Sequence, residues 1–163
     1  MTAVLHRPAR LGPRLRSLLD LCPVEGPVAD IGSGHGRLAY ELALRLPAGQ
    51  VFATEAKRGP AAELRRLLGP LAPVTILEGD GLAPLRHVGC RGAVIAGMGG
   101  RTMAGILTAD EDVASSLAWI CLQPIQRVEL LAGWLSQQGL WTVRRTIAME
   151  RRHTYHSFLL ERR

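Results

Sequence analysis

Short apolar runs alternate along this chain with segments in which apolar residues recur at helical spacing. Leu38, Leu42 and Leu46 stand four residues apart, and comparable stripes occupy residues 61–68 and 128–135, so each segment presents the one apolar face of an amphipathic helix. Continuous apolar strands that alternate with such helices are typical of a mostly parallel sheet covered on both faces. The runs that we predict to be strands are Val28–Ile31, Val51–Thr54, Val74–Leu77, Ala93–Ala96, Trp119–Leu122, Trp141–Ile147 and Tyr155–Leu160.

The two ends of the chain depart from this alternation. Leucines at helical spacing among the arginines of residues 11–21, followed by Pro23, predict a short amphipathic helix. Near the other end, only the charged turn Met149–His153 separates the last two predicted strands. We therefore predict an α/β fold with a doubly wound, mostly parallel, Rossmann-like sheet of seven strands and an antiparallel terminal hairpin. Residues 1–24 would form a helix packed on the domain, and residues 25–163 the domain itself, within one structural domain.

Composition excludes several classes of protein. With 163 residues, of which 47% are hydrophobic and 21% charged, the chain suits one folded domain and is too apolar for intrinsic disorder. The three cysteines form no C-x-x-C pair, so we expect buried thiols and no metal site. No run approaches the eighteen apolar residues of a membrane span, and four arginines interrupt the first 22 residues. We expect a cytoplasmic protein without a membrane partner.

The charge balance leaves two interpretations open. The chain has 20 basic and 14 acidic residues, a net charge of +6 and a pI near 10.2. Such a surplus favours a polyanionic partner, because each neutralised phosphate releases condensed counterions. The alternative is an ordinary solvated surface that happens to be rich in arginine.

A glycine-rich loop follows the first predicted strand directly and precedes the first predicted helix. It extends from Asp30 to Gly36 and reads D-I-G-S-G-H-G. A dinucleotide fingerprint requires a third glycine at position 37, where this chain has Arg37. Asp30 would repel a pyrophosphate but suits a cationic ligand such as S-adenosylmethionine, which carries a sulfonium and an ammonium group. A glycine turn without any ligand remains the alternative.

Two further acids follow the next two predicted strands. Glu55, followed by Ala56, stands where a doubly wound sheet presents a carboxylate to ribose hydroxyls. Asp80, followed by Gly81, can accept a hydrogen bond from an adenine amino group. Taken alone, Glu55 can be a surface charge and Asp80 part of a plain turn. Together with Asp30 they place one acid at each of three successive strand ends, which favours a ligand crevice.

The fourth predicted strand leads into the glycine-rich segment Gly97–Gly100, which also contains Met98. Its glycines leave room for an acceptor, which must approach the donor methyl to roughly 3 Å; a simple strand-to-helix turn is the alternative. His35 can contact the acceptor or cap the following helix. Gln123, after the fifth strand, can meet either substrate or backbone.

These motifs resemble the bacterial tRNA adenine N1-methyltransferases that act on adenine 22 in the D-arm region. The resemblance implies a class I methyltransferase fold, S-adenosylmethionine as cofactor and tRNA as partner. It also implies cofactor roles for Asp30, Gly32, Glu55 and Asp80, to which we add Ser33, Gly34, Gly36, Ala56, Gly81 and Gly97. The residues that carry it are Ala29–Ser33 with His35, Glu55 with Gly59-Pro60, Gly79–Leu82, and above all I-A-G-M-G-G at Ile95–Gly100 with Leu122–Pro124.

The remaining predictions concern the acceptor. His35, Gly97 and Met98 are the candidates for the acceptor site, without a general base, and Arg7, Arg10, Arg14 and Arg37 are the candidates for contacts with tRNA phosphates.

The chain also departs from the resembled family. The family usually has an acid and a tyrosine where Gly34 and Arg37 stand, asparagine where Ile125 stands, and glutamate where His156 stands, and it adds a C-terminal coiled-coil extension that this sequence lacks. Three alternatives therefore stay open: a class I methyltransferase for another RNA site or a small molecule, a non-catalytic S-adenosylmethionine-binding module, and a nicotinamide-binding domain, which Asp30 and the early Gly36 disfavour.

Overall fold

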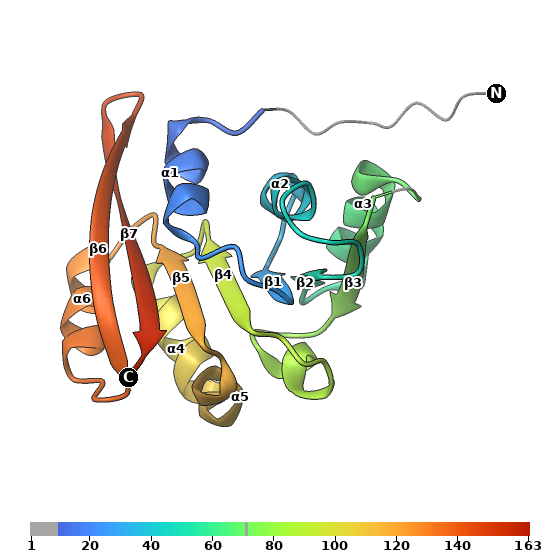
Figure 1. Ribbon diagram of the computed structural model, residues 1–163. Coiled ribbons are helices and arrows are strands. Elements are labelled where there is room, and N and C mark those ends of the chain that lie inside the picture. The colour runs from blue at the N-terminus through green and yellow to red at the C-terminus, as the bar shows by residue number, and fades with distance from the viewer. Residues whose placement is uncertain (1–9, 71) are drawn as a thin grey trace.

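The computed structural model describes residues 10–70 and 72–163 and places seven strands in one sheet with helices on both faces (Figure 1). The strand order is β3-β2-β1-β4-β5-β7-β6. Neighbours from β3 to β5 are parallel, whereas β7 runs antiparallel to both β5 and β6. The predicted fold class, with its terminal hairpin, is confirmed. The strands are β1 (Val28–Ile31), β2 (Val51–Glu55), β3 (Val74–Glu78), β4 (Gly92–Ala96), β5 (Trp119–Gln123), β6 (Trp141–Glu150) and β7 (His153–Arg162).

The strand order reverses between β1 and β4. The chain moves outward from β1 to β3 and then returns to place β4 on the other side of β1. In open α/β sheets, ligands bind at such a reversal, outside the carboxyl ends of the strands. The helix α1 (Pro13–Leu21) precedes the sheet. The helices between the strands are α2 (Arg37–Ala43), α3 (Arg58–Leu68), the 3-10 helix η1 (Ala83–His87), α4 (Gly100–Ala109), α5 (Glu111–Ser116) and α6 (Val128–Ser136).

Two hydrophobic clusters cover the two faces of the sheet. Alternate residues of each strand point to opposite faces, so Val28 joins the cluster that includes α1, α2 and α3, while Ala29 joins the one that includes α4, α5 and α6. In the first cluster, Leu18 and Leu19 of α1 are buried, and α1 packs against β5, β6 and β7. The proposed boundary after residue 24 stays a prediction.

The terminal hairpin is longer than its sequence pattern predicts. The strands pair as far as Glu150 and His153, so the turn consists of Arg151 and Arg152 alone and is narrower than the predicted Met149–His153. Both arginines have positive φ angles, 47° and 66°, as a two-residue type I′ turn requires. The pattern was misleading because the outer part of the hairpin is exposed: the side chain of Met149, for example, is 67% exposed.

Candidate cofactor and acceptor site

The carboxyl ends of β1, β2, β3 and β4 meet at one edge of the sheet, where two cavities adjoin. Both cavities are lined by Gly32, Glu55 and Met98. The first, here called the β3-side cavity, has a volume of about 540 Å³ and is further lined by Ile31, Thr54, Ala56, Gly79, Asp80, Gly81, Ala83, Thr102, Gly105, Ile106, Ala109 and Asp110. The second, the α1-side cavity, has a volume of about 480 Å³ and is further lined by Arg14, Leu15, Asp30, Ser33, Gly34, His35, Arg37, Leu38, Ala96 and Gly97.

The structure brings nearly all the predicted cofactor residues to these cavities. Gly36 is the exception. It lies at the start of α2 with a φ of 70°, and a Cβ added to it would stand 2.7 Å from Leu64 Cδ1 and 2.9 Å from Leu68 Cδ2 of α3. Its lack of a side chain therefore serves the packing of α2 against α3, and the structure does not place it at either cavity.

The glycine loop is fixed by hydrogen bonds to the end of β2. The Gly32 N–H donates to Thr54 Oγ1 at 3.2 Å, and the Gly34 N–H donates to Glu55 Oε1 at 2.6 Å. Gly32 has a φ of 64°, and the Met98 Cε atom occupies the space that a Cβ there would take. The loop thus needs glycine at position 32 both for its backbone conformation and for the close approach of Met98.

Asp30 supplies a buried carboxyl group to the α1-side cavity. Only 3% of its surface is exposed, and the Ser33 hydroxyl donates to its Oδ2 at 2.6 Å. Burial raises the pKa of Asp30 to about 7, although the hydrogen bond from Ser33 acts in the opposite direction. No basic side chain within the described residues forms an ion pair with it. A cationic group in the cavity would therefore stabilise its ionised form.

The other two acids are more accessible. Glu55 is half-buried at the end of β2 and has one oxygen engaged by the glycine loop, while Asp80 is exposed on the loop after β3. Both line the β3-side cavity, together with Ala56 and Gly81. These two carboxylates in the lining of one cavity can accept hydrogen bonds from hydroxyl or amino groups of a ligand.

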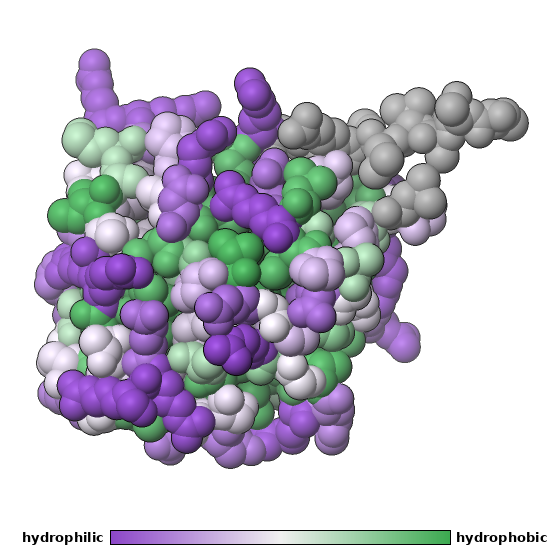
Figure 2. All heavy atoms as spheres, in the orientation of Figure 1, coloured by the Kyte–Doolittle hydropathy of each residue, from purple (hydrophilic) through white to green (hydrophobic). Residues whose placement is uncertain are grey.

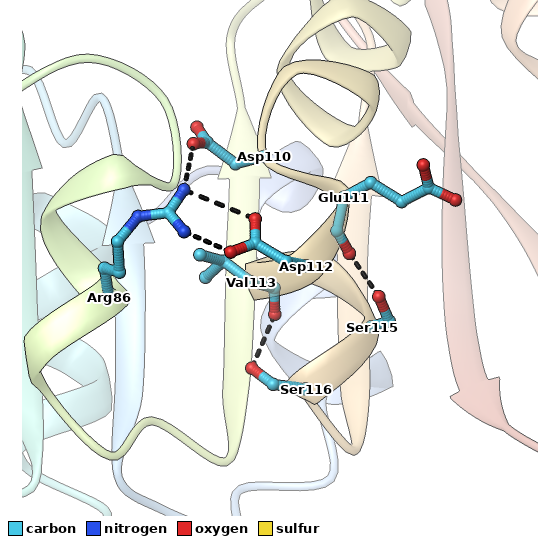
Figure 3. Close-up of polar contacts among 7 residues, drawn as sticks. All are labelled: Arg86, Asp110, Glu111, Asp112, Val113, Ser115 and Ser116. Carbon is cyan, nitrogen blue, oxygen red and sulfur yellow. Dashed lines mark hydrogen bonds and ion pairs between the residues drawn. The ribbon is translucent and has the colours of Figure 1, made fainter.

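A further part of the lining of this cavity was not apparent from the sequence. It consists of Thr102, Ile106 and Asp110 of α4 and its end. Arg86 of η1 donates to Asp110 Oδ1 at 3.0 Å and also bonds to Asp112 (Figure 3). This ion pair joins η1 to the start of α5, next to the cavity-lining Asp110. No motif marks it, because the partners are 24 and 26 residues apart.

The predicted acceptor residues meet in the α1-side cavity. Gly97 has a φ of 76°, and no atom lies within 4 Å of the place of a Cβ there. The Met98 carbonyl accepts a hydrogen bond from the Ile125 N–H at 3.0 Å, which ties the loop after β4 to the loop after β5. His35 lies in the same cavity and is exposed. Space is therefore open beside Gly97, and its role toward an acceptor stays a prediction.

The side chain of Gln123 forms its hydrogen bonds with other residues of the protein. It is fully buried, and its Nε2 donates to the Arg14 carbonyl and to Ser157 Oγ, each at 2.9 Å. Its Oε1 accepts from Arg14 Nη1 at 3.2 Å. The two interpretations left open from the sequence are thereby resolved in favour of a structural contact.

The four arginines predicted to contact tRNA have different surroundings. Arg14 and Arg37 line the α1-side cavity, and Arg37 is exposed in the first turn of α2. Arg10 is exposed but lines neither cavity. Arg7 lies outside the described residues. On the face shown in Figure 2, hydrophilic side chains surround an apolar area.

The described part of the chain has neither a membrane-spanning helix nor a cluster of metal-ligating side chains. None of its helices has the length and apolar character of a membrane span. Within residues 10–70 and 72–163, no group of three or more His, Cys, Asp and Glu side chains could hold a metal ion.

Known proteins share both the sequence pattern and the fold. A tRNA (adenine(22)-N(1))-methyltransferase of Bacillus subtilis is 28% identical over 155 residues, which make up 93% of this chain and 65% of that protein. This chain thus spans slightly less than two thirds of that relative. The crystal structure of the B. subtilis M1A22 tRNA methyltransferase TrmK has a TM-score of 0.83 and 27% identity, with 94% of this chain and 67% of that chain covered.

A second solved structure includes a ligand. Streptococcus pneumoniae Sp1610, in complex with S-adenosyl-L-methionine, has a TM-score of 0.81 and 26% identity, covering 94% of this chain and 73% of that chain. In addition, the family model of the methyltransferase domain matches residues 11–158. Because that match includes every strand and helix except the last few residues of β7, the chain belongs to the methyltransferase-domain family.

Proposed function

We propose that this chain transfers a methyl group from S-adenosylmethionine to N1 of an adenine in tRNA. The observation that carries the proposal is the pair of adjoining cavities at the sheet reversal, with acids from β1, β2 and the loop after β3 along their walls. The similarity to the B. subtilis tRNA (adenine(22)-N(1))-methyltransferase over 93% of the chain supports the choice of substrate.

The residues present fit this cofactor. Asp80 and Glu55 would accept hydrogen bonds from the adenine amino group and the ribose hydroxyls in the β3-side cavity, while Asp30 would accept from the ammonium group in the α1-side cavity. The buried Asp30 carboxyl, which has no basic partner among the described residues, favours a cationic ligand. The cofactor supplies a methyl group activated by the sulfonium.

The acceptor would enter beside Gly97, where the protein leaves room for it. Adenine N1 has a free lone pair at neutral pH, so the reaction requires no general base. The protein's contribution is then proximity and orientation, which can be worth several kcal/mol. His35 and Met98 line the same cavity and would hold the base in place.

Binding of tRNA would use exposed arginines around the α1-side cavity. Arg37 lines the cavity and Arg10 is exposed at the start of the described chain, and the net charge of +6 favours a polyanion. An adenine within a helix must be turned out first, at a cost of a few kcal/mol that phosphate contacts can offset. A cytoplasmic location, where tRNA is available, is part of this proposal.

A second candidate is methyl transfer to another RNA site or to a small molecule. It is favoured by Gly34 and Arg37, which stand where the resembled family has an acid and a tyrosine. Both positions line the α1-side cavity, so they would alter the surroundings of the acceptor and leave the β3-side cavity unchanged.

Mass spectrometry of nucleosides distinguishes the candidates. The protein is incubated with methyl-labelled S-adenosylmethionine and total tRNA, and the tRNA is then digested to nucleosides. Labelled N1-methyladenosine supports tRNA adenine methylation, whereas label in a different product supports the second candidate. Binding of the cofactor without any labelled product would contradict both. Asp80→Ala is the control for loss of cofactor binding. It leaves the adenine amino group of the cofactor without its hydrogen-bond acceptor and should weaken cofactor binding by roughly 1–3 kcal/mol.

A further inference from the structure

The side chain of Arg14 is held at the α1-side cavity by contacts that use few of its donors. Its Nη1 donates to Gln123 Oε1, and its guanidinium carbon lies 5.4 Å from the centroid of the Tyr155 ring. Neither partner is negatively charged, and no acid in the described part of the chain forms an ion pair with Arg14. A guanidinium has five N–H donors in a fixed fork, so most of them remain for an anionic ligand.

Gln123 contacts both the side chain and the backbone carbonyl of this arginine. The buried amide accepts from the Arg14 side chain and donates to the Arg14 carbonyl, while its second donor contact goes to the buried Ser157. Gln123 is the register partner of Ala96, which lines the α1-side cavity next to Gly97. The position of Arg14 is therefore set by a residue of the sheet. This favours a specific contact of Arg14 with a ligand over the role of a solvated surface charge.

Asp30 faces the same cavity from another strand. It lies on the sheet face that α1 and α2 cover, since Val28, two residues earlier on β1, packs in their cluster. The α1-side cavity thus presents a fixed guanidinium from α1 and a buried carboxyl group from β1. A pair of opposite charges in one small cavity is complementary to a zwitterion, and an α-amino acid carries its ammonium and carboxylate on one carbon.

We propose that Arg14 binds the carboxylate of the cofactor's methionine portion while Asp30 binds its ammonium group. This assignment rests on the proposed function, and it departs from the expectation that Arg14 contacts a tRNA phosphate. Arginine suits the role because its fork can donate two parallel hydrogen bonds to a carboxylate. Gln123 is a positioning residue that acts through Arg14.

Two ligands that differ only in the amino acid portion test the assignment in the absence of RNA. S-adenosylhomocysteine carries the ammonium and the carboxylate, whereas 5′-methylthioadenosine lacks both. Calorimetry on the full chain should show that Arg14→Gln weakens S-adenosylhomocysteine binding by roughly 10- to 100-fold, the usual effect of losing a charged hydrogen bond. Binding of 5′-methylthioadenosine should stay within about twofold, which also shows that the fold and the β3-side cavity are intact.

Three further variants sharpen the test. Arg14→Lys, which keeps the charge but loses the fork, should give an intermediate loss. Gln123→Leu should also weaken S-adenosylhomocysteine selectively, because a purely structural defect would weaken both ligands. Arg16→Gln is the matched control: Arg16 is exposed on the same helix, and its replacement should change neither affinity.

The outcomes separate this inference from the proposed function. If Arg14→Gln affects both ligands alike, or lowers tRNA affinity while leaving S-adenosylhomocysteine unchanged, the carboxylate assignment is wrong and the methyltransferase proposal stands. If the unmodified protein binds neither ligand, both proposals fail.

Discussion

At the scale of single residues, the carboxyl group of Asp30 is expected to lower the stability of the folded protein and to strengthen ligand binding. Burial raises its pKa from 3.8 to about 7, so near neutral pH the ligand-free protein holds this group partly protonated. The ionised form is unfavourable in the folded protein until a cation joins it. Asp30 should therefore lower the stability of the ligand-free protein and, on the proposed function, contribute to cofactor binding; the two effects can be measured separately.

Replacing Asp30 with asparagine should make the ligand-free protein more stable at high pH. Because the folded pKa is higher than the unfolded one, the folded state binds the proton more tightly. The carboxyl's contribution is therefore fully present below about pH 4 and is lost as the pH rises to about 7. A rise from 3.8 to about 7 corresponds to ~4 kcal/mol at most. Urea unfolding of Asp30→Asn and the unmodified protein at pH 5, 6 and 8 measures the difference, and a difference that does not grow over this range contradicts the account.

Cofactor affinity should depend on the same proton in the opposite sense. The ammonium group of S-adenosylhomocysteine favours the ionised carboxylate, so binding should release a proton where free Asp30 is protonated. The affinity is then expected to rise with pH up to about 7, the pKa of the free site, and to level off above it. Calorimetry between pH 6 and 8 tests this. Asp30→Asn should bind more weakly and lose this part of the pH dependence; a variant that keeps the full dependence would show that another group is responsible.

At the scale of elements, the loop after β1 is organised by Gly32. Its positive φ disfavours any side chain by about 1–2 kcal/mol, and a Cβ there would displace the Met98 methyl, which lines both cavities. Gly32→Ala should therefore lower both the free energy of unfolding and the affinity for S-adenosylhomocysteine.

The double variant Gly32→Ala with Met98→Ala separates these two effects. Removing the Met98 side chain relieves the clash and should recover part of the affinity, whereas the loss of stability caused by the backbone strain should persist. Denaturant unfolding and calorimetry on the two variants and on Met98→Ala alone provide the comparison. If the double variant binds no better than Gly32→Ala, Met98 does not obstruct the site.

The hairpin turn is another element with a conformation that its residues disfavour. Arg151 and Arg152 both have positive φ angles, where asparagine and glycine are preferred in type I′ turns. Replacing them with Asn-Gly should stabilise the protein by about 1 kcal/mol. The matched control is Ala-Ala, which removes the same charges but keeps the strain and should give no gain. Thermal unfolding of both variants decides, and equal stabilisation would assign the effect to charge.

The sequence pattern predicts some helices and strands better than others. The strands β1, β4 and β5 were predictable because burial on both faces leaves continuous apolar runs. The outer part of the hairpin, by contrast, is exposed, and its charged residues resemble a turn. The helix α4 has a short stripe at Met103, Ala104 and Leu107 but also contains two glycines, which weaken the pattern.

The site was predictable to the extent that it repeats with the β-α units. Asp30, Glu55 and Asp80 follow successive strands, so their convergence follows from the topology. The hydrogen bonds of Gln123 to Arg14 and of Thr54 to Gly32 join segments 109 and 22 residues apart, and they depend on side-chain directions that spacing does not give. Gly36 was assigned to the cofactor because the glycines in the loop look alike, although it contacts α3.

At the scale of the whole molecule, the sheet reversal between β1 and β4 places two adjoining cavities at the edge of a basic protein, and we propose that they bind two chemically different halves of one ligand. On this proposal, the acids of the β3-side cavity would bind the nucleoside, and Arg14 and Asp30 of the α1-side cavity would bind the amino acid portion. Met98 and Gly32 lie where the two cavities meet, so the reacting centre is expected there, next to the open space at Gly97.

A crystal structure of the protein with S-adenosylhomocysteine tests this account most directly. The account predicts adenine at Asp80, ribose at Glu55, the ammonium group at Asp30 and the sulfur atom between Gly32 and Met98. A ligand bound elsewhere, or one whose nucleoside lies in the α1-side cavity, would contradict it.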